Sequence, residues 1–250
     1  MQYNKLKLSK QIYTLPYRRI NMRESILTIP VNEIFEPKCG CPICRMRDML
    51  EERTVDYIMG AAMMEPDVRI ETNRQGFCKT HFEQMRACKN RLSLALMLQS
   101  HLQSMQKNIF DRSKTGFFES KTAKQKKVSA VNNDCFVCSK IEWGMSRLMV
   151  TVFELYQKER EFRTLFAEQE QLCLPHYDML VSLAAEKLEK RWLGDFVNAC
   201  TELTKKYLDS LEADVSHFCK MYDYRNTGKD ADWGNSKDSI ERAIKFLTTR

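Results

Sequence analysis

Apolar positions spaced by three and four residues recur along this chain and predict helices over most of its length. The clearest stripe lies in the C-terminal half, beyond Pro175. Its members are Leu188, Trp192, Phe196, Cys200, Leu203, Tyr207, Leu211, Val215 and Phe218. Because proline is accepted in the first turn of a helix, we expect one long helix that begins at Pro175 and carries the whole stripe.

Shorter stripes predict further helices. One begins in or just after Cys41-Pro42-Ile43-Cys44 and ends at Gly60, and a long one starts near Thr80, a plausible N-cap, and includes the apolar run 92–98. Another helix begins near residue 139, and a shorter one includes Phe162 and Phe166. Asn235 or Ser236 can cap a last helix, which carries Ile240, Ile244 and Leu247 on one side. With only 8 Gly and 6 Pro in 250 residues, the chain is expected to be all-α.

The N-terminal region departs from this pattern. Residues 26–35 are extended by composition, and Pro30 has no N–H to donate, which favours an edge or wrapping segment. Residues 1–21 carry five basic side chains and no acidic one, and are expected to form a flexible basic extension. The predicted fold therefore has a short extended segment before its helices.

Cysteine and histidine recur in two sets with nearly the same internal spacing. The first set is Cys41-x-x-Cys44 followed by Cys78-x-x-His81, and the second is Cys135-x-x-Cys138 followed by Cys173-x-x-His176. The second set lies 94 residues after the first at its front pair and 95 at its rear pair. This repetition predicts two pseudo-repeated halves, each built around one set.

Each set offers three thiolates and one imidazole, which is the closed tetrahedral shell of a structural Zn²⁺. We therefore expect two zinc ions per chain. Site 1 would be Cys41, Cys44, Cys78 and His81, and site 2 would be Cys135, Cys138, Cys173 and His176. A helix of about 16 residues spans roughly 24 Å, so two antiparallel helices would bring each pair of motifs together and the zinc would clamp a helical hairpin. An iron–sulfur cluster is the alternative for the same ligands.

This arrangement predicts an order of segments along the chain. Residues 1–21 form the extension, 22–110 the first zinc-helical repeat, 111–133 a linker and 134–220 the second repeat. Residues 221–250 form a C-terminal tail and a helix that packs on the body.

Two chemical alternatives to structural zinc arise from the same residues. Cys-x-x-Cys thiols can form a disulfide and release a metal, which would make a redox switch. His81-Phe82-Glu83 has the His-x-Glu form of zinc deaminases, but there this motif precedes the Cys-x-x-Cys pair and a water holds the fourth position. Here the order is reversed, Cys78 completes the shell, and Asp178 replaces the glutamate in the second set, so no catalytic residue is expected.

The other cysteines and histidines have simpler interpretations. Cys200 and Cys219 lie on or at the end of the apolar stripe and are interpreted as small buried hydrophobes. Cys39 could compete for the first metal, but the alignment of the two sets selects Cys41. His101 and His217 lie on helices without ligand partners at a useful spacing.

The charge and composition of the chain indicate which kinds of ligand and which cellular compartment to expect. The net charge is +7, yet residues 1–21 and 107–127 each carry +5, so the remainder is slightly acidic and nucleic acid is not expected as a ligand. No stretch approaches 18 uninterrupted apolar residues, so no membrane span is expected, and the N-terminus lacks the apolar region of a signal peptide. Ten cysteines without a secretion signal indicate a reducing, cytoplasmic setting.

The sequence also resembles an uncharacterised bacterial family, common in clostridia and catalogued as a domain of unknown function. The motifs that carry the resemblance include Cys-Pro-Ile-Cys at 41–44, Gly-Phe-Cys-Lys-Thr-His at 76–81 and Cys-Leu-Pro-His at 173–176. Further matching segments are 27–33, 67–73, 91–98, 223–226 and 233–236. The resemblance covers about 24–250 and implies a fold and two metal sites, but no established activity.

Together these observations predict a helical protein with two zinc sites that acts as an interaction or regulatory module for a protein partner, without its own catalysis. A thiol-based redox or metal sensor is the alternative function. A zinc-dependent enzyme is the third.

Overall fold

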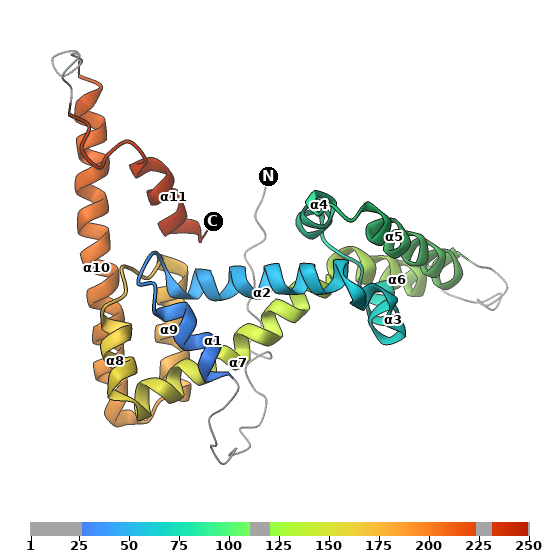
Figure 1. Cartoon of the computed structure of the whole chain (residues 1–250), viewed down its shortest axis with the longest axis horizontal. Helices are drawn as coiled ribbons and strands as arrows, with labels where there is room; N and C mark the ends of the chain where they lie inside the picture. The colour runs from blue at the N-terminus through green and yellow to red at the C-terminus, as the bar shows by residue number, and fades with distance from the viewer. Residues whose placement is uncertain (1–26, 111–120, 224–231, 250) are drawn as a thin grey trace. The chain divides into compact units, whose positions relative to one another are not determined.

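The computed structural model describes residues 27–110, 121–223 and 232–249 (Figure 1). Across these ranges the chain is helical and contains no strand, so the predicted all-α class is confirmed. The chain divides into two compact units. The terminal unit is drawn from residues 1–46 and 146–250, and the central unit is 47–145. Two long helices, α2 (Pro42–Met59) and α7 (Phe136–Lys158), contribute residues to both units.

The expected extended segment at 26–35 is instead a helix, α1 (Thr28–Phe35). Pro30 is the third residue of this helix, and the first four N–H groups of a helix have no partner within it. The proline that argued for an extended segment is therefore accepted in the first turn. Val31, Ile34 and Phe35 are buried on one side of α1, which is a helical and not an alternating pattern.

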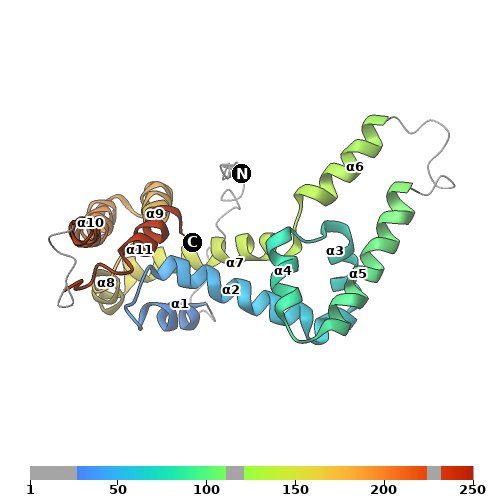
Figure 2. The ribbon, with the colours of Figure 1, turned by 90° about the horizontal axis from the view of Figure 1, so that it is seen from above.

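The terminal unit contains α1, α8 (Arg160–Ala167), α9 (Leu174–Lys187), α10 (Lys190–Met221) and α11 (Ser239–Thr248). The stripe that predicted one long helix from Pro175 is broken. Leu188 and Glu189 have extended backbone angles and separate α9 from α10. This turn lets α9 fold back and pack against α10, which also packs against α8 and α11 (Figure 2).

Aromatic side chains form the core of the terminal unit where four helices meet. Phe35 comes from α1, Tyr156 from α7, Phe166 from α8 and Phe196 from α10. Ring centroids lie 4.8 Å apart for Tyr156 and Phe196, 5.2 Å for Phe166 and Phe196, and 5.8 Å for Phe35 and Phe166. Buried aromatic pairs at such distances add to the free energy gained by burying their large apolar surface.

The central unit contains most of α2, then α3 (Pro66–Gln75), α4 (Lys79–Ala87), α5 (Arg91–Met105), α6 (Lys121–Asn133) and the start of α7. A 3₁₀ turn covers Ala61–Met64 and a π-helical turn covers Gln106–Phe110. The single helix expected from Thr80 is two helices, because the chain turns at 88–90 and the Asn90 side chain caps α5 by accepting from Ser93 N at 3.2 Å. Part of the expected linker, Lys121–Asn133, is α6.

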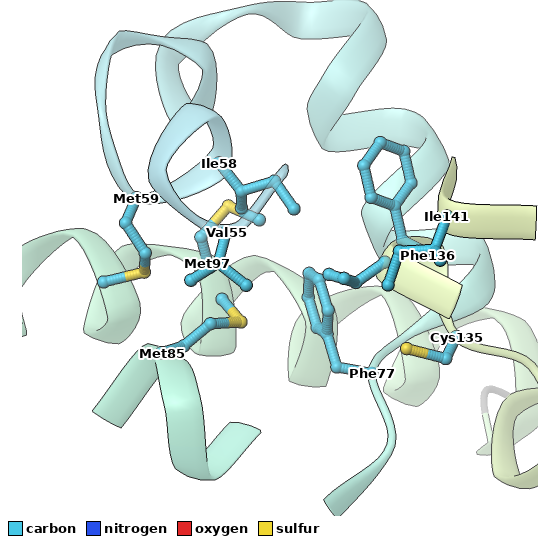
Figure 3. Packing of buried hydrophobic residues seen from close by; sticks show 10 residues of the cluster. Val55, Ile58, Met59, Phe77, Met85, Met97, Cys135, Phe136 and Ile141 are labelled. Atoms are coloured by element: carbon cyan, nitrogen blue, oxygen red, sulfur yellow. The ribbon is translucent and has the colours of Figure 1, made fainter. Parts of the chain in front are cut away.

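Methionine, aliphatic and aromatic side chains fill the core of the central unit (Figure 3). Ile58 of α2, Met85 of α4 and Met97 of α5 are almost fully buried. Cys135 lies beside Phe77 and Phe136 at one end of this core. In the same unit α2 and α7 approach closely at Gly144, where an added Cβ would lie 2.9 Å from the Leu50 side chain.

Candidate metal centres

Both Cys-x-x-Cys pairs stand at the start of a long helix. Cys41 directly precedes α2 and Cys135 directly precedes α7, and their partners Cys44 and Cys138 lie in the first helical turn. The backbone N–H of Arg45 donates to the carbonyl of Cys41 at 3.2 Å, and Ser139 donates to Cys135 at 3.0 Å. A separation of three residues across this turn places the two sulfurs of each pair on the same side of the helix end.

The two Cys-x-x-His pairs have the same relation to shorter helices. Cys78 is the N-cap of α4 and Cys173 is the N-cap of α9, each with extended backbone angles. His81 and His176 are the third residues of these helices and are both buried. The expected N-cap at Thr80 is therefore wrong, since the cap position is Cys78. All four ligand pairs begin a helix.

The structure gathers the eight predicted ligands into two groups, but not into the groups expected from their order in the sequence. The Cys41 cluster, in the terminal unit, contains Cys41, Cys44, Cys173 and His176. The Cys78 cluster, in the central unit, contains Cys78, His81, Cys135 and Cys138. In each cluster the four ligand atoms lie within 4.8 Å of one another. The expected grouping, which kept each set to its own half of the chain, is thereby corrected.

The lengths of the helices explain why each Cys-x-x-Cys pair lies with the Cys-x-x-His pair of the other set. α2 has 18 residues and α7 has 23, so they span about 27 Å and 35 Å. The helices that follow them, α3 with 10 residues and α8 with 8, span only about 15 Å and 12 Å. The shorter helix is thus too short to bring the chain back to the Cys-x-x-Cys pair at the start of the longer helix. Each Cys-x-x-Cys pair instead meets the Cys-x-x-His pair of the other half of the sequence.

The distances in the Cys41 cluster centre on one ring nitrogen. His176 Nδ1 lies 3.0 Å from the sulfur of Cys173, 3.3 Å from that of Cys44 and 3.5 Å from that of Cys41. The sulfurs of Cys44 and Cys173 are 3.7 Å apart. All four side chains are buried.

The Cys78 cluster repeats this arrangement. His81 Nδ1 lies 3.1 Å from the sulfur of Cys78, 3.2 Å from that of Cys135 and 3.5 Å from that of Cys138. The sulfurs of Cys78 and Cys138 are 4.0 Å apart, and both of these side chains are partly exposed. The other ring nitrogen of His81, Nε2, lies 2.8 Å from Oε1 of the buried Glu51.

The ligand spacing fits a single tetrahedral ion. Zinc bonds of about 2.3 Å to sulfur and 2.0–2.1 Å to nitrogen at tetrahedral angles require S···S near 3.8 Å and S···N near 3.6 Å. The observed S···S separations of 3.7 and 4.0 Å lie close to the first value, and the S···N separations of 3.0–3.5 Å are somewhat shorter than the second. They are far longer than a disulfide bond of about 2.05 Å, and none of the ten cysteines is disulfide-bonded.

Electrostatics within each cluster favour one thiolate and oppose more. In the Cys78 cluster, hydrogen bonding from Cys138, with the help of His81, lowers the pKa of Cys135 to about 3 despite burial. The same hydrogen bond, together with burial and the charge of Cys135, raises the pKa of Cys138 well above its ordinary value. In the Cys41 cluster burial alone would raise the pKa of Cys41, but hydrogen bonds from Cys173, Cys44 and His176 lower it, and hydrogen bonds to Cys173 and Cys41 raise the pKa of Cys44. Three thiolates would therefore require a compensating cation.

Helix ends supply part of that compensation. Each cluster lies where two helices begin, α2 and α9 for the Cys41 cluster and α4 and α7 for the Cys78 cluster. The N-terminus of a helix carries roughly half a positive charge and unpaired N–H groups, which favour thiolates. The arrangement is therefore suited to a site whose ligands carry more negative charge than one divalent ion neutralises.

Buried contacts hold the ligand loops. In the central unit Phe136 N donates to the carbonyl of Gly76 at 3.0 Å, which ties the two ligand-bearing loops together. Gly76 has φ of 65°, and the ring of His101 lies 3.1 Å from the position that its Cβ would take. His101 Nδ1 lies 3.1 Å from the carbonyl of Asn73. His101 is therefore a buried histidine that belongs to neither cluster.

In the terminal unit Arg45 and the residues around it hold the loop before Cys41. Arg45 donates to the carbonyl of Ile34 at 2.6 Å and to the side chain of Gln169 at 3.1 Å. The N–H of Gly40 donates to the carboxylate of Glu170. These bonds connect α1, the Cys41 loop and the segment that precedes Cys173.

The remaining candidates lie apart from the clusters. Glu83 and Asp178 are exposed and belong to neither cluster, and Glu83 lies 3.8 Å from Lys79 across one helical turn. Cys200 is fully buried, as expected, whereas Cys219 is exposed because the apolar stripe is only half-buried at that end of α10. His217 lies at 2.9 Å from the carbonyl of Asp232. Sequence reasoning missed Glu51, since it lies in the polar run Glu51-Glu52-Arg53, which is typical of a solvated helix face.

No curated protein and no solved structure matches the chain. Among the described residues, no helix combines the length and apolar character needed to cross a membrane. A family model does match, over residues 22–250, which include both clusters and leave out the expected extension 1–21. The chain therefore belongs to the DUF6062 family, a family of unknown function.

Proposed function

We propose that this chain is a zinc-binding helical protein that acts as an interaction or regulatory module, with one structural Zn²⁺ in each cluster. The observation that carries the proposal is the convergence of eight ligand atoms into two compact Cys₃His shells. Closed shells of this composition are the ordinary ligand set of structural zinc.

The geometry supports a single ion over the alternatives for these ligands. An iron–sulfur cluster with two or more irons would set its ligand pairs apart by the width of the cluster, whereas the four ligand atoms of each group here lie within 4.8 Å of one another. The mixed sulfur and nitrogen set also favours zinc over the hard cations, which prefer oxygen ligands.

The positions of the ligands in the chain support a structural role. The Cys41 cluster joins residues 129 to 135 positions apart, and the Cys78 cluster joins residues 54 to 60 positions apart. Each metal would thus bind two segments that otherwise associate only through packing and a few hydrogen bonds between their ligand loops. The binding free energy of structural zinc, about 10–16 kcal/mol in small modules, is comparable to the stability of a whole domain.

A filled shell argues against catalysis at the metals. Three thiolates and one imidazole leave no position for water or substrate, and the acidic residues that follow the two histidines, Glu83 and Asp178, are exposed. The setting that we propose is a bacterial cytoplasm, where reducing conditions keep thiolate ligands intact.

A protein partner is part of the proposal. Helix α11 carries Ile240, Ile244 and Leu247 at a spacing that places them on one face, and these side chains are 43%, 54% and 55% exposed. Apolar side chains gathered on one exposed face are typical of surfaces that bind other proteins. The partner itself is to be identified by purification from the native cell with mass spectrometry.

A thiol-based sensor is the second candidate function, and one observation favours it. The Cys78 cluster presents two sulfurs, those of Cys78 and Cys138, that are 4.0 Å apart and partly exposed, so an oxidant could reach them. The Cys41 cluster, in contrast, is buried throughout.

Metal analysis followed by oxidation tests both candidates. Protein purified without a metal-affinity tag is expected to contain about two zinc ions per chain, in keeping with two closed shells. Zinc that stays bound under mild peroxide supports the structural module. Release from the Cys78 cluster with disulfide formation and a change of fold supports the sensor. A chain without metal that keeps its full helicity would refute both.

A further inference from the structure

The two ring nitrogens of His81 face different chemical groups. Nδ1 faces the three sulfurs of the Cys78 cluster, at 3.1 to 3.5 Å. Nε2 lies 2.8 Å from Oε1 of Glu51, which belongs to α2 and is only 8% exposed. The His81 side chain is itself 3% exposed, so water has little access to this contact.

A neutral imidazole carries its single proton on one nitrogen and keeps a lone pair on the other. With the proton on Nε2, His81 donates a hydrogen bond to the Glu51 carboxylate, and the lone pair on Nδ1 points to the sulfurs. Metal-binding histidines are commonly oriented by a carboxylate in this way, and the partner also makes the ring a stronger ligand. Glu51 therefore lies where a carboxylate would orient His81 as a ligand.

The histidine of the Cys41 cluster has no such carboxylate partner among the described residues. His176 Nδ1 faces Cys41, Cys44 and Cys173, and in the ranges that the structure describes no carboxylate lies within hydrogen-bonding distance of its other nitrogen. The repeat in the sequence agrees: the offset of 94 residues between the Cys-x-x-Cys pairs places Met145 at the position equivalent to Glu51. Methionine cannot accept a strong hydrogen bond from an imidazole.

We propose that Glu51 is a positioning residue that selects Nδ1 as the ligand atom of His81 and strengthens metal binding at the Cys78 cluster alone. This rests on the proposed function, namely that the clusters hold zinc. The two sites then retain their metal by different means. The Cys41 cluster relies on complete burial, and the more exposed Cys78 cluster relies on a buried carboxylate behind its histidine.

Three variants separate the effect of the Glu51 charge, the effect of its hydrogen bond and the effect of removing any nearby carboxylate. Glu51→Gln keeps an acceptor and removes the charge, whereas Glu51→Leu removes both. Glu52→Gln makes the same chemical change at the exposed neighbouring residue and is the matched control. Each zinc-loaded variant is mixed with a chromogenic chelator, and the release of its two metal ions is followed separately.

We expect Glu51→Leu to weaken one of the two sites by about 10–100-fold, Glu51→Gln to weaken it less, and Glu52→Gln to behave as wild type. The affected site is identified by ¹⁵N NMR of the histidine rings. In wild type, Nδ1 of His81 should be metal-bound and Nε2 protonated, and the Nε2 proton should exchange faster in Glu51→Leu while the His176 signals stay unchanged. Should Glu51→Leu fail to fold, Glu51→Gln carries the same readouts.

The outcomes distinguish the two proposals. A wild-type chain that holds no zinc refutes the proposed function and this inference with it. A wild-type chain with two zinc ions whose release is the same in the Glu51 variants and in Glu52→Gln leaves the function standing and overturns the role of Glu51. A wild-type His81 ligated through Nε2 also overturns it.

Discussion

At the scale of single residues, the candidate metal centres depend on one local arrangement that is used four times. A first ligand directly precedes a helix or caps it, and a second lies in the first turn, so both side chains point to the same place. The arrangement needs no information beyond three residues of spacing and a helix start, which is why the sequence alone identified all eight residues that the structure gathers into the two clusters. It does not determine which two pairs share a metal.

Paired cysteine variants test the grouping directly. Cys44→Ser should leave about one metal per chain, because it opens one of two closed shells. Adding Cys173→Ser should cost no further metal, since both residues belong to the Cys41 cluster, whereas adding Cys78→Ser should remove the second ion. Cys39→Ser, at an exposed cysteine outside both clusters, should keep two ions. Metal content by mass spectrometry is the measurement, and the grouping in sequence order would reverse the results of the two double variants.

At the scale of helices, the breaks between elements set where the ligands lie. Gly76 precedes the Cys78 knuckle with φ of 65°, and its missing side chain leaves room for the His101 ring. A residue with a Cβ would be strained there by its backbone and would also press on that ring. The loop conformation that presents Cys78 to its cluster therefore depends on glycine.

Two glycine variants of opposite sign test this. Gly76→Ala should lower the free energy of unfolding by at least about 1–2 kcal/mol, because alanine has no favourable left-handed conformation and the His101 ring lies 3.1 Å from the new Cβ. Gly194→Ala, inside α10 with open space around its Cβ, should raise it by about 0.5–1 kcal/mol. Urea denaturation of the zinc-loaded protein measures both, and a stabilising Gly76→Ala would contradict the assignment.

The aromatic core of the terminal unit predicts a response to alkaline pH. Burial, with nearby Cys200 and Asp195, raises the pKa of Tyr156 to about 12, against about 10 in an unfolded chain. The folded state thus holds this proton more tightly, and the stability that results is present below pH 10 and is lost as the pH rises from about 10 to 12. Tyr156→Phe should make the free energy of unfolding fall less steeply with pH in this range. Tyr57→Phe, at an exposed site, should leave this pH dependence unchanged. Equal slopes for both variants would contradict this origin.

At the scale of the whole molecule, the clusters join the two halves of the sequence within each compact unit. The Cys41 cluster combines residues 41 and 44 with 173 and 176, and the Cys78 cluster combines 78 and 81 with 135 and 138. Every one of these associations spans positions 111–120. Both metals would therefore hold the chain together across a break at that point.

A nicked protein tests this consequence. With a protease site introduced within 111–120 and cleaved, we expect the two fragments to elute together with two zinc ions, because each metal takes ligands from both fragments. A strong chelator should then separate them, since structural zinc contributes folding free energy directly. Native mass spectrometry is the measurement. Fragments that separate with one metal each would instead support a metal site within each half.

Sequence alone determined the features that depend on local order. Period-3.6 stripes identified the all-α class, and the Cys-x-x-Cys and Cys-x-x-His spacings identified eight residues that the structure gathers into two Cys₃His clusters. The errors at this level concern helix ends. Pro30 is accepted in the first turn of a helix. The apolar stripes continue through the turns at Leu188 and Asn90, because the helices before and after each turn both bury apolar side chains.

Only the tertiary structure decided which ligand pairs meet. The spacings of 33 and 34 residues are compatible with a hairpin of two equal helices, but the chain uses that length as one long helix and one short one. The position of the break within the spacer determines whether the motifs return to each other. Glu51 became visible for the same reason: its carboxylate is buried only because α2 passes the ring of His81, 30 residues away in the sequence. Such contacts depend on where helices end and pack, which no local spacing encodes.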